Sequence, residues 1–119
     1  MNRLELKKVK RLRRKAHIRK RVTGTPERPR MTVYRSARYI YIQVIDDSQG
    51  QTLAWASNRE GSLRQIKSTV AGAGELGQVI GKRLKEKSVA KVVFDRNAYA
   101  YHGVVKAIAE GARKAGIEF

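Results

Sequence analysis

Residues 39–46 read Tyr-Ile-Tyr-Ile-Gln-Val-Ile-Asp, and their alternation decides the fold class. Ile40, Ile42 and Val44 fall on one side of an extended chain, and the two tyrosines and Gln43 fall on the other. A period of two residues is typical of a strand with one buried face, because successive side chains of a strand point to opposite sides. The stretch therefore predicts a strand whose isoleucine and valine side chains face a core.

Two further strands are predicted beside this one. Residues 31–35 are rich in strand formers and are joined to it by Ser36-Ala37-Arg38. On the other side, residues 46–50 read Asp-Asp-Ser-Gln-Gly, which favours a turn because Asp and Ser bond to nearby backbone and Gly tolerates a positive φ. Residues 52–56 then form a third strand, so the three make an antiparallel meander.

The second half of the chain alternates helix and strand. Residues 62–65 have the spacing of a capping box, but Gly72 and Gly74 argue against one unbroken helix, so we expect the helix from about Glu75 to Lys87. Residues 89–94 form an apolar strand, and a last helix ends at Gly116 after a buried stripe at Val105, Ile108, Ala109 and Ala112.

A strand–helix–strand connection favours a right-handed crossover with the new strand parallel to its neighbour. The sequence therefore predicts an α/β fold: a mixed sheet of about four strands, with an antiparallel three-strand meander plus a parallel fourth, covered by helices.

The first thirty residues carry most of the positive charge. They hold 13 of the 27 lysines and arginines against two carboxylates, Glu5 and Glu27, so they supply about +11 of the formal +17. Cations at this density cannot all find carboxylates within the protein, whereas a phosphate backbone supplies the counter-charge. The expected partner is a nucleic acid, contacted by Lys7, Lys8, Arg11, Arg13, Arg14, Arg19 and Arg21.

This basic segment has too little apolar surface to pack firmly. Helix formers are frequent, but only a thin apolar line runs along it, so we expect it to be partly disordered when free and ordered on its partner. Residues 23–29 contain Pro26 and Pro29, which break any helix. The chain thus divides into a basic arm, residues 1–29, and an α/β domain, residues 30–119.

Composition excludes several classes of protein. The chain has no cysteine and two histidines, so it offers no disulfide framework, zinc finger or thiolate nucleophile. No apolar run approaches the roughly 20 residues that span a bilayer, and a cytosolic location is expected. The Arg-rich start resembles an organelle transit peptide, but no serine precedes Ser36.

Enzymatic interpretations have weak support. Residues 72–77 fit the dinucleotide pattern G-x-G-x-x-G, but the polar residues 65–70 make a poor buried strand before it. The carboxylates Asp46, Asp47 and Asp95 do not form a nuclease-like metal cluster, and His102 has no nucleophile in a recognisable elbow beside it. We expect no catalytic residue, no metal and no cofactor.

Two segments of the domain are candidate RNA contacts. Arg35, Arg38, Tyr39 and Tyr41 interleave cations with rings on which an unstacked base could lie, although they are also compatible with ordinary strand aromatics and solvated charges. Residues 95–103 lead into a helix whose N-terminal amides favour an anion, or they form a self-satisfied turn in which Asp95 caps amides and Tyr101 packs.

These segments resemble the bacterial ribosomal protein L18 family of the large subunit, which binds 5S rRNA. The resemblance covers essentially the whole chain and is carried by residues 26–30 (Pro-Glu-Arg-Pro-Arg), 33–36 (Val-Tyr-Arg-Ser), 40–47 (Ile-Tyr-Ile-Gln-Val-Ile-Asp-Asp), 93–96 (Val-Phe-Asp-Arg), 101–103 (Tyr-His-Gly) and 105–119.

The resemblance implies a non-enzymatic, monomeric scaffold with ribonuclease-H-like topology and a basic N-terminal extension. Such a scaffold would attach 5S rRNA to the large-subunit rRNA in the central protuberance, beside other 5S-associated proteins. By matching position, the residues on the RNA-facing side would be Arg28, Arg30, Arg35, Ser36, Arg38, Arg96, Tyr101 and His102. The chain departs from the family at Val104, where Arg is usual, and at Asn97-Ala98, which replace a more glycine-rich turn.

Charge alone leaves a second class of function open. A general nucleic-acid chaperone or DNA-binding protein would also carry a basic arm, and a nucleotide-dependent oxidoreductase would use the glycine pattern. The sequence also leaves open whether the ribosome in question is bacterial or organellar.

Overall fold

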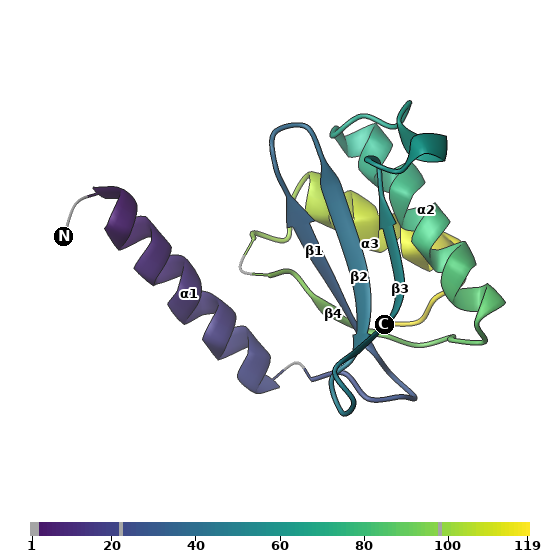
Figure 1. Ribbon diagram of the computed structural model, residues 1–119, viewed down its shortest axis with the longest axis horizontal. Coiled ribbons are helices and arrows are strands. Elements are labelled where there is room, and N and C mark those ends of the chain that lie inside the picture. Colours follow the sequence, from purple (N-terminus) through teal and green to yellow (C-terminus); the bar gives the residue numbers. More distant parts are fainter. Residues whose placement is uncertain (1–2, 22, 98) are drawn as a thin grey trace.

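The computed structural model describes residues 3–21, 23–97 and 99–119, without the side chains of Arg3 and residues 15–21. The elements follow the order α1 (Arg3–Arg21), β1 (Arg30–Arg35), β2 (Ile40–Asp46), β3 (Gln51–Ser57), η1 (Gly61–Leu63), α2 (Val70–Glu86), β4 (Val93–Asp95) and α3 (Val104–Lys114). The four strands form one sheet, and α1 stands apart from it (Figure 1).

The sheet has the predicted topology. Its strand order is β3-β2-β1-β4, with β1–β2 and β2–β3 antiparallel and β1–β4 parallel. The meander and the parallel fourth strand are therefore confirmed. The ribonuclease-H-like topology stays a prediction.

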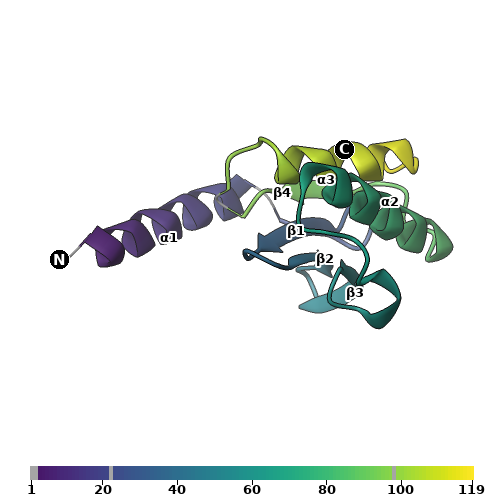
Figure 2. The ribbon, with the colours of Figure 1, turned by 90° about the horizontal axis from the view of Figure 1, so that it is seen from above.

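The core lies between one face of the sheet and two helices. Ile40, Ile42 and Val44 are fully buried, as the alternation in β2 predicts, while Gln43 is exposed. Figure 2 shows α2 and α3 side by side on this face. In the described part of the chain no helix covers the opposite face, so the helices enclose only one side of the sheet.

Helix α2 begins earlier than the sequence predicts. It starts at Val70, capped by Thr69, whose side-chain oxygen accepts a hydrogen bond from the Gly72 N–H at 3.2 Å. The expected start near Glu75 is wrong, because Gly72 and Gly74 lie inside the helix. Ser62, the first residue of the apparent capping box, belongs to the short 3-10 helix η1 and does not start α2.

Glycines in these helices serve close packing. A Cβ at Gly77 would overlap the backbone carbonyl oxygen of Ile108 in α3, and one at Gly111 would overlap the carbonyl oxygen of Gly74 in α2. The two helix backbones approach so closely that these positions have no room for a side chain. Tertiary packing thus outweighs the low helix propensity of glycine.

Strand β4 is shorter than the predicted strand over residues 89–94. Only Val93–Asp95 pairs with β1. The preceding residues turn to the C-terminal tail instead: the Val92 N–H donates to the Glu118 carbonyl oxygen at 3.0 Å, and the Glu118 N–H donates to the Ala90 carbonyl oxygen at 2.9 Å. The apolar run is therefore divided between the sheet and the tail.

The basic arm forms the single helix α1, although the sequence predicts an arm that is partly disordered when free. Leu4 and Leu12 are 72% and 64% exposed, so its thin apolar line has no core to join. The order of the free arm stays a prediction. Among the described residues no helix has the length and apolar character to cross a membrane.

The α2–α3 contact predicts opposite effects for two neighbouring glycines. Gly77→Ala should lower the free energy of unfolding by about 1–3 kcal/mol, because the new methyl group meets a backbone carbonyl. At Gly74 a Cβ would meet open space, so Gly74→Ala should raise the free energy of unfolding by about 0.5–1 kcal/mol. Urea denaturation of both variants tests this, and equal destabilisation would contradict the packing argument.

Candidate nucleic-acid interface

The turn between β1 and β2 is closed by its own hydrogen bonds. The Ser36 N–H donates to the Tyr39 carbonyl oxygen at 2.8 Å, and the Tyr39 N–H donates to Ser36 Oγ at 3.2 Å. Buried Asn58 supports the turn, because its Nδ2 donates to the Arg38 carbonyl oxygen at 3.1 Å. This fixed tip exposes the side chains of Arg35, Ser36 and Arg38.

Tyr99 joins the loop between β4 and α3 to this hairpin. Its hydroxyl accepts a hydrogen bond from the Arg35 N–H at 3.4 Å and donates one to the Arg35 carbonyl oxygen at 3.3 Å. Tyr99 is not among the contacts predicted from the sequence, because the hydrogen bond joins residues 64 positions apart. The loop that carries Arg96, Tyr101 and His102 is thereby held beside the hairpin.

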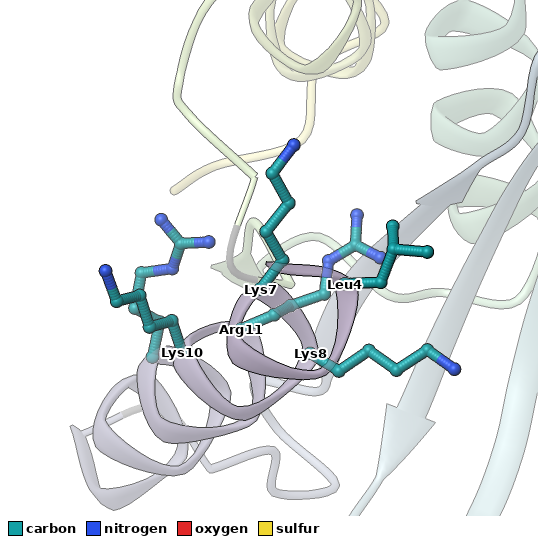
Figure 3. A pocket seen from close by; sticks show the side chains of 6 residues that line it. Leu4, Lys7, Lys8, Lys10 and Arg11 are labelled. Atoms are coloured by element: carbon teal, nitrogen blue, oxygen red, sulfur yellow. The ribbon is translucent and has the colours of Figure 1, made fainter. Parts of the chain in front are cut away.

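The arm meets the domain at the same tyrosine. The Arg11 guanidinium lies 5.1 Å from the centroid of the Tyr99 ring, within the range of a cation–π contact. Figure 3 shows the neighbouring basic side chains projecting from α1, where they and Leu4 line a hollow. Of the seven cations predicted to contact nucleic acid from the arm, the structure shows five as exposed: Lys7, Lys8, Arg11, Arg13 and Arg14. The side chains of the other two, Arg19 and Arg21, lie outside the described residues.

Arg59 adds a cation to the aromatic part of the hairpin. Its guanidinium lies 5.3 Å from the centroid of the Tyr39 ring and donates a hydrogen bond to the Tyr41 hydroxyl at 3.3 Å. That hydrogen bond raises the pKa of Arg59 above its ordinary value. Arg59 is also absent from the predicted contacts, although a basic residue just after the third predicted strand could have indicated one.

The loop after β4 is partly stabilised by hydrogen bonds and packing among its own residues and those next to it. Asp95 Oδ1 accepts a hydrogen bond from the Asn97 N–H at 2.9 Å, and Asn97 takes a φ of 55°, which a glycine-rich turn would adopt readily. The Tyr101 ring packs edge-on against Phe94, with 6.1 Å between ring centroids. The ring is still 41% exposed, and Arg96 and His102 are exposed as well.

Comparison with known proteins shows the family of the chain. Residues 5–119 match the family model for ribosomal L18 of archaea, bacteria, mitochondria and chloroplasts. The chain belongs to the ribosomal L18 family. It is therefore a ribosomal protein of the large subunit, part of the ribosome in the cytoplasm.

Individual relatives share half or more of their aligned residues with this L18-family chain. The large ribosomal subunit protein uL18 of Treponema denticola is 60% identical over 110 residues, covering 92% of each chain. The uL18 protein of Dictyoglomus turgidum is 54% identical over 121 residues, covering 99% of this chain and 96% of the relative. That of Thermotoga petrophila is 55% identical over 118 residues, covering 97% of each.

Val104 stands where the resemblance to the L18 family predicts an arginine. The side chain is 5% exposed and belongs to the core at the start of α3. A buried apolar group cannot reach a phosphate, so this position contributes packing in the present L18-family protein.

The glycine pattern of residues 72–77 has no dinucleotide-site geometry. It lies within α2, and in the described chain no strand runs into Gly72. Among the described residues no group of three or more His, Asp or Glu side chains could hold a metal ion. Asp95 instead serves the fold, since it is 2% exposed and bound to Arg30.

Arg30 corrects the predicted RNA-facing set. It is 5% exposed, and its guanidinium donates to Asp95 Oδ2 at 2.8 Å and to Asp47 Oδ2 and Oδ1 at 2.9 and 3.1 Å. The hydrogen bond to Asp47 outweighs the opposing effect of burial and, with the bond to Asp95, raises the pKa of Arg30. A buried cation bound to two carboxylates stabilises the domain and offers no charge to RNA. Arg28, by contrast, is exposed.

Loss of the Arg30 guanidinium should destabilise the protein strongly. Arg30→Met should lower the free energy of unfolding by about 3–5 kcal/mol, because Asp95 would remain buried without a cation. Arg28→Met removes the same charge from an exposed position and should change stability by less than about 0.5 kcal/mol. Thermal and urea unfolding compare the two, and equal stability of both variants would contradict the role assigned to Arg30.

Proposed function

We propose that this protein is a non-enzymatic scaffold that binds 5S rRNA and helps attach it to the large-subunit rRNA in the central protuberance. In this role it acts as a monomer within the ribosome, beside other 5S-associated proteins. The choice of 5S rRNA rests on the resemblance of the hairpin and of residues 93–103 to the RNA-facing segments of the L18 family.

The observation that carries the proposal is the meeting of three basic segments at Tyr99. This residue is bonded to the hairpin at Arg35 and lies under Arg11 of the arm. The segment from Arg96 to His102 forms the third part of the same surface. A phosphate backbone passing over this surface would meet cations from all three segments, and the net charge of +17 favours its approach.

Each segment has its own part in recognition. The arm neutralises phosphates, so most of the affinity is electrostatic. The hairpin and loop are held in fixed geometry, which suits recognition of RNA shape, since A-form duplex hides its base edges in a deep groove. The rings of Tyr39 and Tyr41 add surfaces for an unstacked base.

A general nucleic-acid chaperone is the second candidate, and the arm alone would serve it equally well. The fixed contacts of Tyr99 favour the dedicated scaffold, because a nonspecific polyanion binder does not need a positioned hairpin and loop. An oxidoreductase is disfavoured by the position of its glycine pattern inside α2.

Binding to 5S rRNA should be specific and strongly dependent on salt. If about eight phosphates are contacted, log K should fall with log salt with a slope of roughly −6 to −7. Binding of labelled 5S rRNA at physiological salt should survive a large excess of tRNA. Equal displacement by tRNA and by unlabelled 5S rRNA would contradict the specific role, and a nearly flat salt dependence would contradict the phosphate contacts.

Neutralising the arm should weaken binding without unfolding the domain. Replacement of Arg11, Arg13 and Arg14 by Gln should make the salt slope shallower by about 2–3, one unit for each lost phosphate contact. The melting temperature should be nearly unchanged, because these side chains are exposed on α1. Filter binding over a salt series and thermal melting measure the two effects.

A matched control removes the same charge elsewhere. Lys82, Lys106 and Lys114 are exposed on α2 and α3, outside the three segments of the proposed surface. Their replacement by Gln should leave the slope within about one unit of the unaltered value. Equal losses in both triple variants would show that net charge alone, and no defined surface, governs binding.

A further inference from the structure

The uncovered face of the sheet carries two exposed rings, Tyr34 and Trp55, that the proposed contacts leave out. Tyr34 and Trp55 are 52% and 53% exposed, although both lie on regular strands. Tyr34 is paired with Tyr41 across β1 and β2, and Trp55 is paired with Gln43 across β2 and β3. We name these four residues the open aromatic face.

The rings lie close together on this face. The Tyr34 and Tyr41 ring centroids are 6.0 Å apart with planes tilted by 47°. Trp55 lies diagonally across from Tyr41, a relation that places Cα atoms about 7–8 Å apart in a sheet. The face is opposite to the one covered by α2 and α3 (Figure 2), so these rings are not required to fill the core.

Trp55 is held firmly although its side chain is exposed. Its backbone carbonyl oxygen accepts a hydrogen bond from Arg83 Nη1 at 2.8 Å, which anchors the edge strand β3 to α2. Arg83 also binds Glu60 at 3.0 Å. The Glu60 carboxylate is therefore already paired with a cation, and the backbone that carries the exposed Trp55 ring is fixed to α2.

The surroundings select a polyanion as the occupant. Arg59 lies at the hairpin end of the face, over Tyr39 and bonded to the Tyr41 hydroxyl. Rings beside an exposed guanidinium, with Gln43 between them as a hydrogen-bonding group, suit unpaired bases whose backbone passes the cation. An apolar protein segment would gain nothing from Arg59 and would leave Gln43 without a partner.

We propose that the open aromatic face binds unpaired bases of the bound RNA by stacking on Tyr34, Tyr41 and Trp55. This inference rests on the proposed function and extends it, because it adds Tyr34 on β1 and Trp55 on β3 to the base contact already proposed for Tyr41 on β2. It assigns single-stranded nucleotides to the sheet and duplex to the arm and loop.

Trp55 is the single tryptophan of the chain, so its emission reports on this face directly. Full-length protein is titrated with labelled 5S rRNA while anisotropy of the label and absorbance-corrected tryptophan emission are recorded together. Stacking should quench the emission and shield Trp55 from acrylamide, with saturation at the RNA concentration at which anisotropy saturates.

A matched pair of variants separates ring stacking from mere burial. Tyr34→Leu removes the ring and should weaken RNA binding by about 5- to 100-fold, whereas Tyr34→Phe keeps it and should bind within about twofold of the unaltered protein. Both changes lie at an exposed position, and thermal melting verifies that each variant is folded.

The outcomes distinguish this inference from the proposed function. Saturating anisotropy with unchanged emission and unchanged acrylamide access would overturn the stacking proposal while leaving 5S rRNA binding intact. Equal affinity of Tyr34→Leu and Tyr34→Phe would overturn it as well. Absence of specific binding by anisotropy would remove both proposals.

Discussion

The buried guanidinium of Arg30 holds together the parts of the domain on which the candidate interface is built. It bonds to Asp47 just after β2 and to Asp95 at the end of β4, while Asp47 also accepts a hydrogen bond from the Gly24 N–H at 2.6 Å. One side chain thereby fixes the segment that leads from the arm, the β2–β3 turn and the parallel edge strand. Because a buried charge without partners is costly, the loss of either carboxylate would destabilise this junction.

A series of contacts connects Arg30 to the candidate interface. Asp95, fixed by Arg30, accepts from the Asn97 N–H and so directs the start of the β4–α3 loop. Two residues further on, Tyr99 reaches the backbone of Arg35 and receives Arg11 from α1. Helix α1, which has little core of its own, thus contacts the β4–α3 loop, and that loop is bonded to the hairpin, which combines strong phosphate attraction with a defined shape.

The local sequence pattern predicted much of the fold, but it did not predict contacts between residues that are distant in the sequence. Alternation in β2 identified the buried face, and the strand–helix–strand order identified the parallel fourth strand. The start of α2 was missed because Gly72 and Gly74 resemble helix breakers, and the sequence does not show that the Thr69 side chain caps the helix ahead of them. Arg30 was grouped with RNA contacts by matching position with the L18 family, because the sequence does not show its pairing with a carboxylate 65 positions away. Tyr99 and Arg59 were missed for the same reason, since their partners are brought to them only by the folded sheet.

The central claim is that α1, the hairpin and the β4–α3 loop form one RNA-binding surface. Hydrogen–deuterium exchange of the full-length protein, with and without bound 5S rRNA, tests it most directly. The account predicts slower exchange in α1, in residues 35–41 and in residues 96–102, with little change in the outer part of α2 between Glu75 and Glu86. Protection confined to α1, or concentrated in α2 and α3, would contradict it.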